Sequence, residues 1–430
     1  MVPHLVTALK GPLLDLERRF LDASPGIERW FRLAWQEHTP PFYCSCDLRN
    51  AGFKLAPVDT NLFPGSFNNL SPDVMPLAVQ AAMAAIEKYC PDARNLLLVL
   101  GRAMRNSFYL EHVKRLAAIM RQTGLNVRFG SLDAQLRKAQ RVELPGGQHL
   151  LVEPLVRRGR RVGLADFDPC SILLNDDLAD EVPQILREVH EQVVLPPLHA
   201  GWAVRRKTNH FAAYRDVARR FAKAFDIDPW LIEPLFAACG AVDFDAKAGE
   251  ECIANNVEAI LRKTRAKYRE YKVRDAPFAI VKADAGTHGV AIMTVKDAKQ
   301  VRGLDVAQRS RMTGANAGRA LAEMVVQEGV PTFETINEAW AEPVVCMIDR
   351  YVVGGFYRVH AGRDKDENLN APGMHFVPLP FAASCLVPDS SASPEDASNR
   401  FYAYGVVARL ALLAASIELE RTDPDQSLYG

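Results

Sequence analysis

A strand, a lysine, a glycine loop and a second strand follow one another in residues 278–295, and this order limits the fold more than any other feature of the chain. An apolar run ends at Lys282, and Gly286 and Gly289 lie in the loop before the next apolar run. A lysine at the end of a buried strand is costly unless an anion or a carboxylate meets it. Loop glycines let backbone N–H groups approach phosphate oxygens closely. The segment therefore predicts a β-hairpin that covers a nucleotide, although an ordinary hairpin with a solvent-exposed lysine would give the same pattern.

Later segments favour the nucleotide interpretation. The loop lacks the Gly-Lys-Ser/Thr of Walker A and the G-x-G-x-x-G of dinucleotide sites. Gln327 and Glu328 instead end an apolar strand, as an adenine-binding hinge between two subdomains requires. Arg358 lies on a further strand and carries the bidentate donors that bind phosphate or carboxylate. Together these residues predict a nucleotide clamp rather than a solvent-exposed hairpin.

Acids and amides are concentrated in residues 363–373. Carboxylate and carbonyl oxygens are the ligands that Mg²⁺ prefers in proteins. The candidate Mg²⁺ ligands are Glu367, Asn368 and Asn370. Asp349 and Glu342 are the second choices. A hydrogen-bonded turn before Pro372 would explain the asparagines as well.

A second cluster of charged and amide side chains lies in residues 47–69. An amino acid presents an α-carboxylate and an α-ammonium group, so its pocket needs basic, acidic and amide partners. Arg105 and Asn106 follow a buried strand, where open α/β sheets bind ligands. Residues 47–69 could alternatively form a solvated loop with Asx-turns, and Arg105 could be a surface charge on the following helix. The candidate substrate-binding residues are Asp47, Arg49, Lys54, Asp59, Asn61, Asn68, Asn69, Arg105 and Asn106.

Composition excludes several classes of protein. The 430 residues contain 52 Lys+Arg and 52 Asp+Glu, so the formal net charge of zero argues against a nucleic-acid-binding protein. No uninterrupted run of about 18 apolar residues is present, so a membrane-spanning helix is not expected, and the first residues do not resemble a signal peptide. The eight cysteines are scattered, which is typical of reduced thiols in a cytoplasmic protein. The sequence leaves a homo-oligomer open.

The order of apolar segments predicts an α/β chain. Residues 95–101, 110–123 and 126–130 form a β-α-β unit of the kind found in open sheets. Residues 44–70 are expected to be a long structured loop or a set of short strands. Residues 180–265 are expected to be mainly helical, strands return after residue 276, and a last apolar helix covers residues 402–419.

The chain resembles one family in the ATP-grasp superfamily. The superfamily order of lysine strand, glycine loop, Gln-Glu hinge, arginine strand and amide-acid loop is present, although His288 and Ala291 depart from the family pattern. Further matching segments are VDTNLFP (58–64), FNNL (67–70), RNSFY (105–109), ILLNDDL (172–178), GW (201–202), RRK (205–207) and AEPVV (341–345). Over roughly residues 40 to 385 the combination is similar to the proteobacterial glutamate–cysteine ligases.

The resemblance implies a mixed α/β fold with a two-lobed ATP-grasp clamp and an N-terminal open-sheet substrate region. The expected division is residues 1–185 on the substrate side, residues 186–325 with a helical segment and the first lobe, and residues 326–430 with the second lobe and the C-terminal helix. The implied cofactors are ATP and Mg²⁺. The implied nucleotide-binding residues are Lys282, Asp284, Gly286, Thr287, Gly289, Gln327 and Glu328, with Lys282 and Arg358 as the catalytic residues.

The implied reaction joins glutamate to cysteine. ATP would phosphorylate the side-chain carboxylate of glutamate, and the amine of cysteine would displace phosphate to give γ-glutamylcysteine, the first step of glutathione biosynthesis. Another ATP-grasp carboxylate–amine ligase, similar to glutathione synthetase, is one alternative. A nucleotide-binding protein without ligase activity is the other.

Overall fold

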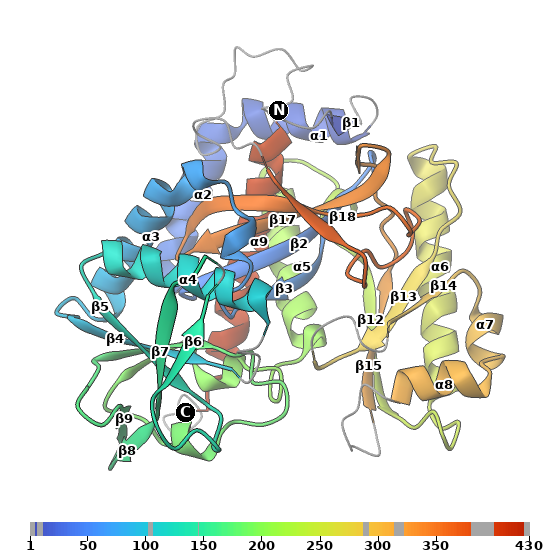
Figure 1. Cartoon of the computed structure of the whole chain (residues 1–430). Coiled ribbons are helices and arrows are strands. Elements are labelled where there is room, and N and C mark those ends of the chain that lie inside the picture. The colour runs from blue at the N-terminus through green and yellow to red at the C-terminus, as the bar shows by residue number, and fades with distance from the viewer. Residues whose placement is uncertain are drawn as a thin grey trace.

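The prediction of a mixed α/β chain is confirmed (Figure 1). The computed structural model describes residues 5–6, 12–101, 106–144, 146–286, 292–313, 322–379 and 400–424. Their strands form sheets of seven, six, four and two strands. The serine-rich segment 390–398, which the sequence predicts to be an exposed linker, lies outside the described residues.

The seven-stranded sheet lies at the centre and combines strands from both ends of the chain. Its strands are β1 (Leu5–Val6), β2 (Tyr43–Asn50), β3 (Leu55–Asn61), β16 (Thr335–Ile336), β17 (Ala339–Ile348), β18 (Tyr351–His360) and β19 (His375–Pro378). β17 pairs antiparallel with β18 and with β2, and β2 pairs with β3. The polar segment after residue 43 therefore folds as strands.

The six-stranded sheet contains the predicted β-α-β unit. Its order is β11-β10-β4-β5-β7-β6, and only β6 is antiparallel to its neighbour. The strands are β4 (Asn95–Leu100), β5 (Asn126–Ser131), β6 (Gln140–Glu143), β7 (His149–Pro154), β10 (Ser171–Asn175) and β11 (Val193–Leu195). Helix α4 (Ser107–Gln122) connects β4 to β5, and α3 (Met75–Tyr89) packs beside it. The buried face of α4 and the leucines of β4 share one apolar core.

The two-stranded sheet is an arginine-rich hairpin of β8 (Val156–Arg158) and β9 (Arg161–Gly163). Arginine side chains of this hairpin donate hydrogen bonds to main-chain carbonyl oxygens of the same chain. Arg157 Nη1 donates to the carbonyl oxygen of Ile185 at 2.9 Å, and Arg161 Nη1 donates to that of Glu191 at 2.6 Å. These contacts give Arg157 and Arg161 structural roles within the protein.

The four-stranded sheet carries the predicted lysine hairpin. Its antiparallel order is β12-β15-β13-β14, from β12 (Phe236–Val242), β13 (Ala279–Ala283), β14 (Ile292–Val295) and β15 (Ala322–Glu328). Helix α6 (Glu250–Glu270) packs on it, and α7 (Ala298–Arg302) and α8 (Val306–Thr313) follow β14. Strand β12 lies in a segment that the sequence predicts to be mainly helical. Its short Ala, Cys and Gly side chains show no clear alternation, so long-range pairing with β15 decides its structure.

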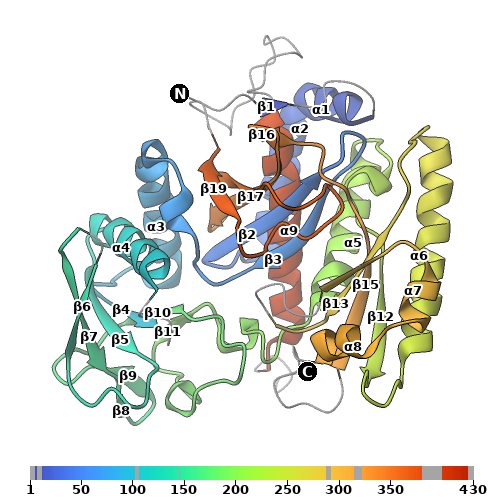
Figure 2. The ribbon, with the colours of Figure 1, turned by 45° about the vertical axis from the view of Figure 1, so that its right-hand side comes forward.

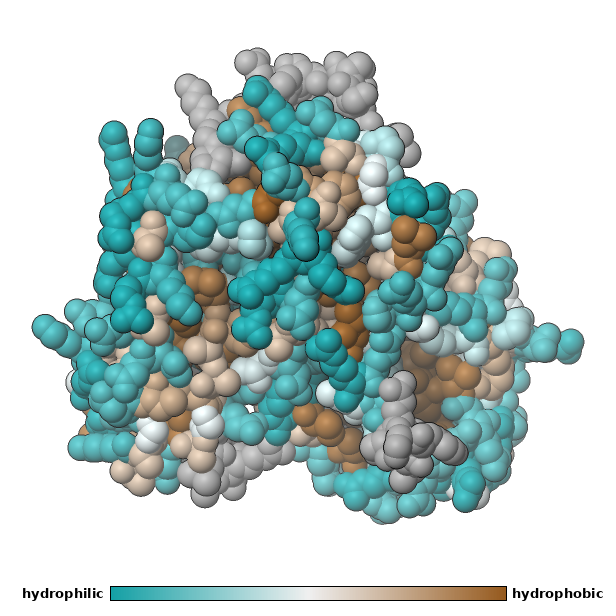
Figure 3. Space-filling view, turned by 180° about the vertical axis from the view of Figure 1, so that it is seen from behind, coloured by the Kyte–Doolittle hydropathy of each residue, from teal (hydrophilic) through white to brown (hydrophobic). Residues whose placement is uncertain are grey.

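Helix α9 (Arg400–Thr422) runs through the core behind the central sheet (Figure 2). It is long and apolar enough to cross a membrane, but 94% of that apolar window is buried inside the protein. It packs against α5 (Lys207–Ala224), α1 (Pro12–Asp22) and strands β2, β3 and β17, whereas α2 (Ser24–Glu37) follows α1. Figure 3 shows one face of the molecule, on which hydrophilic side chains predominate. Short 3₁₀ turns occupy Phe67–Asn69, Pro72–Val74, Gln184–Leu186, Leu198–Ala200 and Pro229–Leu231.

The expected division at residues 185 and 325 stays a prediction. In the central sheet, β2 of the first expected region pairs with β17 of the third, and β3 pairs with β2. These two regions therefore share a sheet and a core.

Candidate active site

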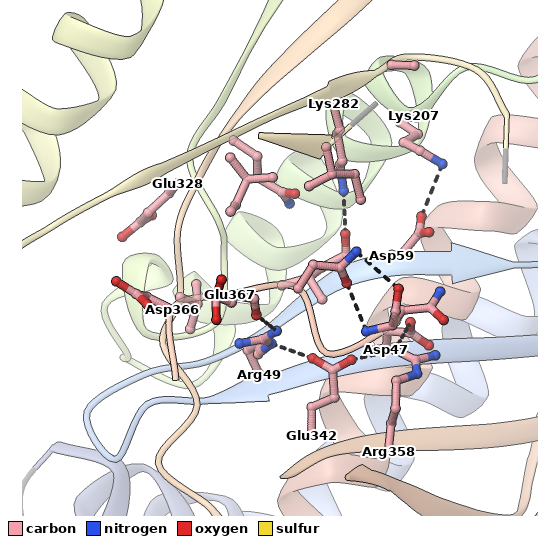
Figure 4. Close-up of a pocket in the computed structure, with 18 of the residues that line it drawn as sticks. Asp47, Arg49, Asp59, Lys207, Lys282, Glu328, Glu342, Arg358, Asp366 and Glu367 are labelled. Atoms are coloured by element: carbon pink, nitrogen blue, oxygen red, sulfur yellow. Dashed lines mark hydrogen bonds and ion pairs between the residues drawn. The ribbon is translucent and has the colours of Figure 1, made fainter. Parts of the chain in front are cut away.

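A pocket lies between the four-stranded sheet and the central sheet, with about 1000 Å³ of space including its open mouth. Both sheets and the loop after β18 contribute to its lining. The lining residues are Asp47, Arg49, Val58, Asp59, Asn61, Lys207, Phe278, Ile280, Lys282, Ala283, Ala285, Gly286, Ile292, Gln327, Glu328, Val330, Glu342, Arg358, Asp366, Glu367, Asn368 and Asn370. Figure 4 shows Lys282 and Lys207 on one side and the charged side chains of the central sheet on the other.

The floor of the pocket is a row of alternating charges, which we call the charge row: Asp47, Arg358, Glu342 and Arg49. Arg358 Nη1 lies 2.9 Å from Asp47 Oδ2 and also pairs with Glu342, while Arg49 Nε lies 2.5 Å from Glu342 Oε2. Strand register explains the row, because Glu342 pairs with Arg358 across β17 and β18, and β2 lies on the other side of β17. The Nε of Arg358 has no hydrogen-bond partner among the described residues.

The two acids of the charge row differ in their pKa. Burial raises the pKa of Asp47 above its usual value, although Arg358 opposes the shift. Burial acts in the same direction on Glu342, but Arg49 and Arg358 together outweigh it and lower its pKa. Glu342 is therefore the anion that holds both guanidinium groups in place.

Lys282 and Lys207 face Asp59 at the opposite side of the pocket. Lys282 Nζ donates to the carbonyl oxygen of Val58 at 2.7 Å, and burial lowers its pKa to about 8. Lys207 Nζ lies 3.5 Å from Asp59 Oδ1 and donates to the carbonyl oxygen of Gly286 at 3.1 Å. Burial acts to raise the pKa of Asp59, but the nearby cations Lys207, Lys282 and Arg205 outweigh this effect. The pKa of Asp59 therefore lies well below its usual range. Two cations thus share this side of the pocket with Gly286.

Lys207 lines the pocket but is not among the predicted site residues. It belongs to the basic triplet 205–207, which alone is typical of a solvated surface. Its ammonium group lies 3.7 Å from the centre of the Trp202 ring, and burial lowers its pKa. The neighbouring tryptophan was the one local signal that this lysine is buried.

Gln327 and Glu328 end β15 at the pocket and have different environments. Gln327 is 2% exposed, and its Nε2 has no partner among the described residues. Glu328 accepts hydrogen bonds from Lys54 Nζ at 2.7 Å, Trp230 Nε1 at 2.9 Å and Leu235 N at 3.0 Å. The Gln327 amide is therefore available to a ligand, whereas Glu328 is already held by the protein.

The loop after β18 brings the candidate metal ligands to the pocket. Glu367, Asn368 and Asn370 all line it. The main-chain N–H of Asn370 donates to Asn368 Oδ1 at 3.0 Å, which is the turn expected as the alternative. Among the residues that the structure describes, no three His, Cys, Asp or Glu side chains gather in a metal-binding group. The donor set offers hard oxygen atoms without a preformed acidic cage.

Several predicted site residues do not line the pocket. Asp284 accepts from Thr208 N and Thr208 Oγ1, both at 2.7 Å, and so fixes the first turn of α5. Asn106 caps α4 by accepting from Phe108 N at 3.0 Å. The others outside the lining are Lys54, Asn68 and Asn69. Arg105, Thr287 and Gly289 lie outside the described residues, as do His288 and Ala291.

Comparison with known families matches residues 17–419 to the family described as glutamate-cysteine ligase. The chain belongs to the glutamate–cysteine ligase family. A crystal structure from Methylobacillus flagellatus KT, provisionally assigned as a γ-glutamylcysteine synthetase, is 58% identical with a TM-score of 0.92. The alignment covers 98% of this chain and 100% of that one.

Two other solved structures are far more distant. A glutathione synthetase-like effector from Globodera pallida is 9% identical over 81% of this chain and 82% of its own, with a TM-score of 0.40. D-alanyl-alanine synthetase A from Vibrio cholerae O1 biovar eltor str. N16961 is 11% identical over 74% and 81%, with a TM-score of 0.33. Neither similarity is strong enough to support an argument. None of the curated proteins compared with the chain matches it.

Family membership confirms the predicted activity. The chain is an ATP-dependent ligase that makes γ-glutamylcysteine for glutathione synthesis. Glutamate, cysteine and ATP are the substrates that this family implies. Family membership therefore argues against both alternatives, which were a different ATP-grasp ligase and a non-catalytic nucleotide-binding protein.

Proposed function

We propose that ATP phosphorylates the γ-carboxylate of glutamate in the pocket between the two sheets. A carboxylate reacts poorly with amines because its leaving group would be oxide. Attack of a γ-carboxylate oxygen on the γ-phosphorus of ATP releases ADP and gives γ-glutamyl phosphate. The amine of cysteine then attacks the carbonyl carbon, and phosphate leaves with the former carboxylate oxygen as the amine loses a proton. The protein contributes positioning and charge complementarity.

This proposal rests on the division of the pocket into two sides. One side carries two lysines, and the other carries the charge row, whose acidic and basic groups suit a zwitterionic amino acid. Lys282 and Lys207 supply positive charge beside the glycine loop, where we place the phosphates of ATP. Asp59 lies between the lysines and the charge row, and fixes the Lys207 ammonium group. Buried cations that are paired with carbonyl oxygens and one carboxylate are suited to receive an anion.

We place the adenine ring at the end of β15. Phe278, Ile280, Ile292 and Val330 supply apolar walls there, and Gln327 supplies a buried amide nitrogen that has no partner among the described residues. An apolar slot with one unpaired amide suits a flat heterocycle that presents donors and acceptors along one edge. Glu328 supports this wall through its bonds to Trp230 and Lys54.

We place the amino-acid head group of glutamate on the charge row. The Nε of Arg358, which has no partner in the part of the chain that the structure describes, is a donor for the α-carboxylate, and Asp47 is the acidic partner for the α-ammonium group. Arg49 holds the acid-and-amide loop through the carbonyl oxygens of Lys365 at 3.0 Å and Glu367 at 2.7 Å. In this arrangement the γ-carboxylate extends toward the lysine side.

We propose that Glu367, Asn368 and Asn370 hold Mg²⁺, because their oxygens are hard donors at the rim of the pocket. When bound, Mg²⁺ neutralises charge on the phosphates. We also propose a cytoplasmic location, which the free cysteines among the described residues support.

Positional isotope exchange tests the acyl-phosphate step. ATP carrying ¹⁸O in the β,γ-bridge is incubated with the enzyme and glutamate, without cysteine. Reversible transfer to glutamate scrambles the label into the β-nonbridging positions, and omission of glutamate abolishes the scrambling. Lys282→Met should lose the exchange, whereas Lys299→Met, an exposed lysine of the same lobe, should keep it. Scrambling that does not require glutamate would exclude γ-glutamyl phosphate.

A further inference from the structure

Two thiols face each other on the four-stranded sheet, away from the pocket lining. Cys239 lies on β12, and Cys252 lies in the first turn of α6. Their sulfur atoms are 3.0 Å apart, and both cysteines are free. The side-chain amide of Asn256 lies one turn further along α6, with Nδ2 3.0 Å from the Cys239 sulfur. A disulfide bond requires the sulfurs to approach by about 1 Å more.

The two thiols differ in access to solvent. Cys252 is exposed, whereas Cys239 is 2% exposed. Burial, followed by the hydrogen bond from Cys252, raises the pKa of Cys239 to about 12. Since the thiolate is the nucleophile in disulfide exchange, Cys239 is poorly suited to react first. A reagent from solvent therefore meets Cys252 first.

We propose that Cys252 and Cys239 form a site of reversible oxidation by low-molecular-weight disulfides. The Cys252 thiolate attacks one sulfur of such a disulfide, forms a mixed disulfide and releases one thiolate. Cys239 then loses its proton and attacks the Cys252 sulfur, which forms the Cys239–Cys252 bond and releases the second thiolate. Both electrons lost by the protein reduce the small disulfide. The proximity of the two sulfurs compensates for the low fraction of Cys239 thiolate.

The bond would join β12 to α6 within one lobe. β12 pairs with β15, so that Cys239 lies opposite Met324 and Phe236 lies opposite Gln327. The link fixes a helix to the sheet that carries Lys282 and Gln327. Closing this short loop restricts the unfolded chain, and the oxidised lobe should therefore unfold at a higher temperature than the reduced lobe. This inference does not depend on the roles proposed for the pocket residues.

Glutathione disulfide is the probe for this site, used on the full chain with reduced glutathione as the control. After incubation, free thiols are alkylated and the digest is analysed by mass spectrometry. We expect a linked peptide pair containing Cys239 and Cys252, a mass lower by two hydrogen atoms, and reversal by dithiothreitol. Peptide mapping separates this link from Cys90 and Cys170, whose thiols also interact.

Two variants test the order of the steps, with circular dichroism to verify folding. Cys239→Ser should stop at the mixed disulfide on Cys252, and Cys252→Ser should leave Cys239 alkylatable after unfolding. The proposal is overturned if both thiols of the wild type stay free, or if the wild type accumulates only the mixed disulfide. A link found only between Cys90 and Cys170 would also overturn it.

Discussion

The Nζ of Lys54 lies 2.7 Å from Oε2 of Glu328, and each side chain is only 1% exposed. The Trp230 ring lies beside the ammonium group, with its centre 4.4 Å away, and its Nε1 donates to the other Glu328 oxygen. Burial lowers the pKa of Lys54, and Glu328 opposes that shift. Lys54 thus joins β2–β3 to the end of β15 from behind the pocket wall.

Removing this lysine alone should destabilise the protein. Lys54→Met leaves a buried carboxylate without its cation, which costs roughly 3–5 kcal/mol of unfolding free energy. Lys54→Met combined with Glu328→Gln removes both charges and should recover much of that loss. Urea unfolding of the three proteins measures the effect. Equal stability of wild type and Lys54→Met would contradict the assignment of a buried ion pair.

The pKa of Lys282 predicts a pH dependence of ATP binding. Burial brings this pKa from 10.5 to about 8, so the ammonium form predominates below pH 8 and is lost above it. The apparent KM for ATP should therefore rise as the pH increases through 8. In Lys282→Met the same profile should be flat, and kcat/KM should fall by roughly 100- to 1000-fold, as for other charge-stabilising donors. A variant with wild-type turnover would show that Lys282 does not contact the phosphates.

Arg49 should affect amino-acid binding more than ATP binding. Arg49→Ala removes a charge partner of Glu342 and two bonds to the loop at Lys365 and Glu367. We expect the KM for glutamate to rise roughly 10- to 100-fold, as for the loss of a charged hydrogen bond, with little change for ATP. Arg363→Ala is the matched control, since its pair with Glu367 is exposed. An increase confined to the KM for ATP would refute the placement of glutamate on the charge row.

The buried carboxylate of Glu418 should stabilise the protein in a pH-dependent way. It pairs with Arg205 at 2.9 and 3.0 Å and with His210 Nδ1 at 3.0 Å. Burial would raise its pKa, but Arg205 and His210 lower it to about 2. Because the folded pKa lies below the usual 4.5, the stabilisation is complete above pH 4.5 and is lost as the pH falls toward 2. Glu418→Gln should be less stable at pH 7 by roughly 3–5 kcal/mol.

Chemical unfolding at several pH values measures this difference. The gap between wild type and Glu418→Gln should narrow as the solution is acidified below pH 4.5. Glu420→Gln, whose carboxylate bonds to the half-buried His38, is the neighbouring control on the same helix. A gap that does not change with pH would exclude a titrating ion pair as its cause.

The lysine hairpin could be predicted from the sequence because its signals are local. The apolar run, Lys282 and the glycines are neighbours in the chain, and the structure pairs β13 with β14 as expected. The charge row has no such signal. By residue type alone, Asp47 and Arg49 could equally belong to a solvated loop, because the side chains that neutralise them, Arg358 and Glu342, lie about 300 residues further along the chain.

The basic triplet 205–207 shows the same limit. Arg205 is buried against Glu418, Arg206 pairs at the surface with Glu323, and Lys207 enters the pocket beside Asp59. Three adjacent cations thus have three different environments, each decided by an acid from a distant segment. Spacing within the triplet cannot distinguish them.

Strands β2 and β17 pair in the central sheet although the ribosome synthesises them at very different times. Asp47 lies opposite Val344 in this sheet, so the first half of the charge row is made long before its partners. At a ribosomal rate of roughly 5–20 residues per second, that interval is on the order of 15–60 s. During this time Asp47 and Arg49 have no counter-charges from β17 and β18, and β2 has an open edge. The nascent chain therefore completes the floor of the pocket only when β17 and β18 emerge, and we expect early termination products to be inactive and prone to aggregate.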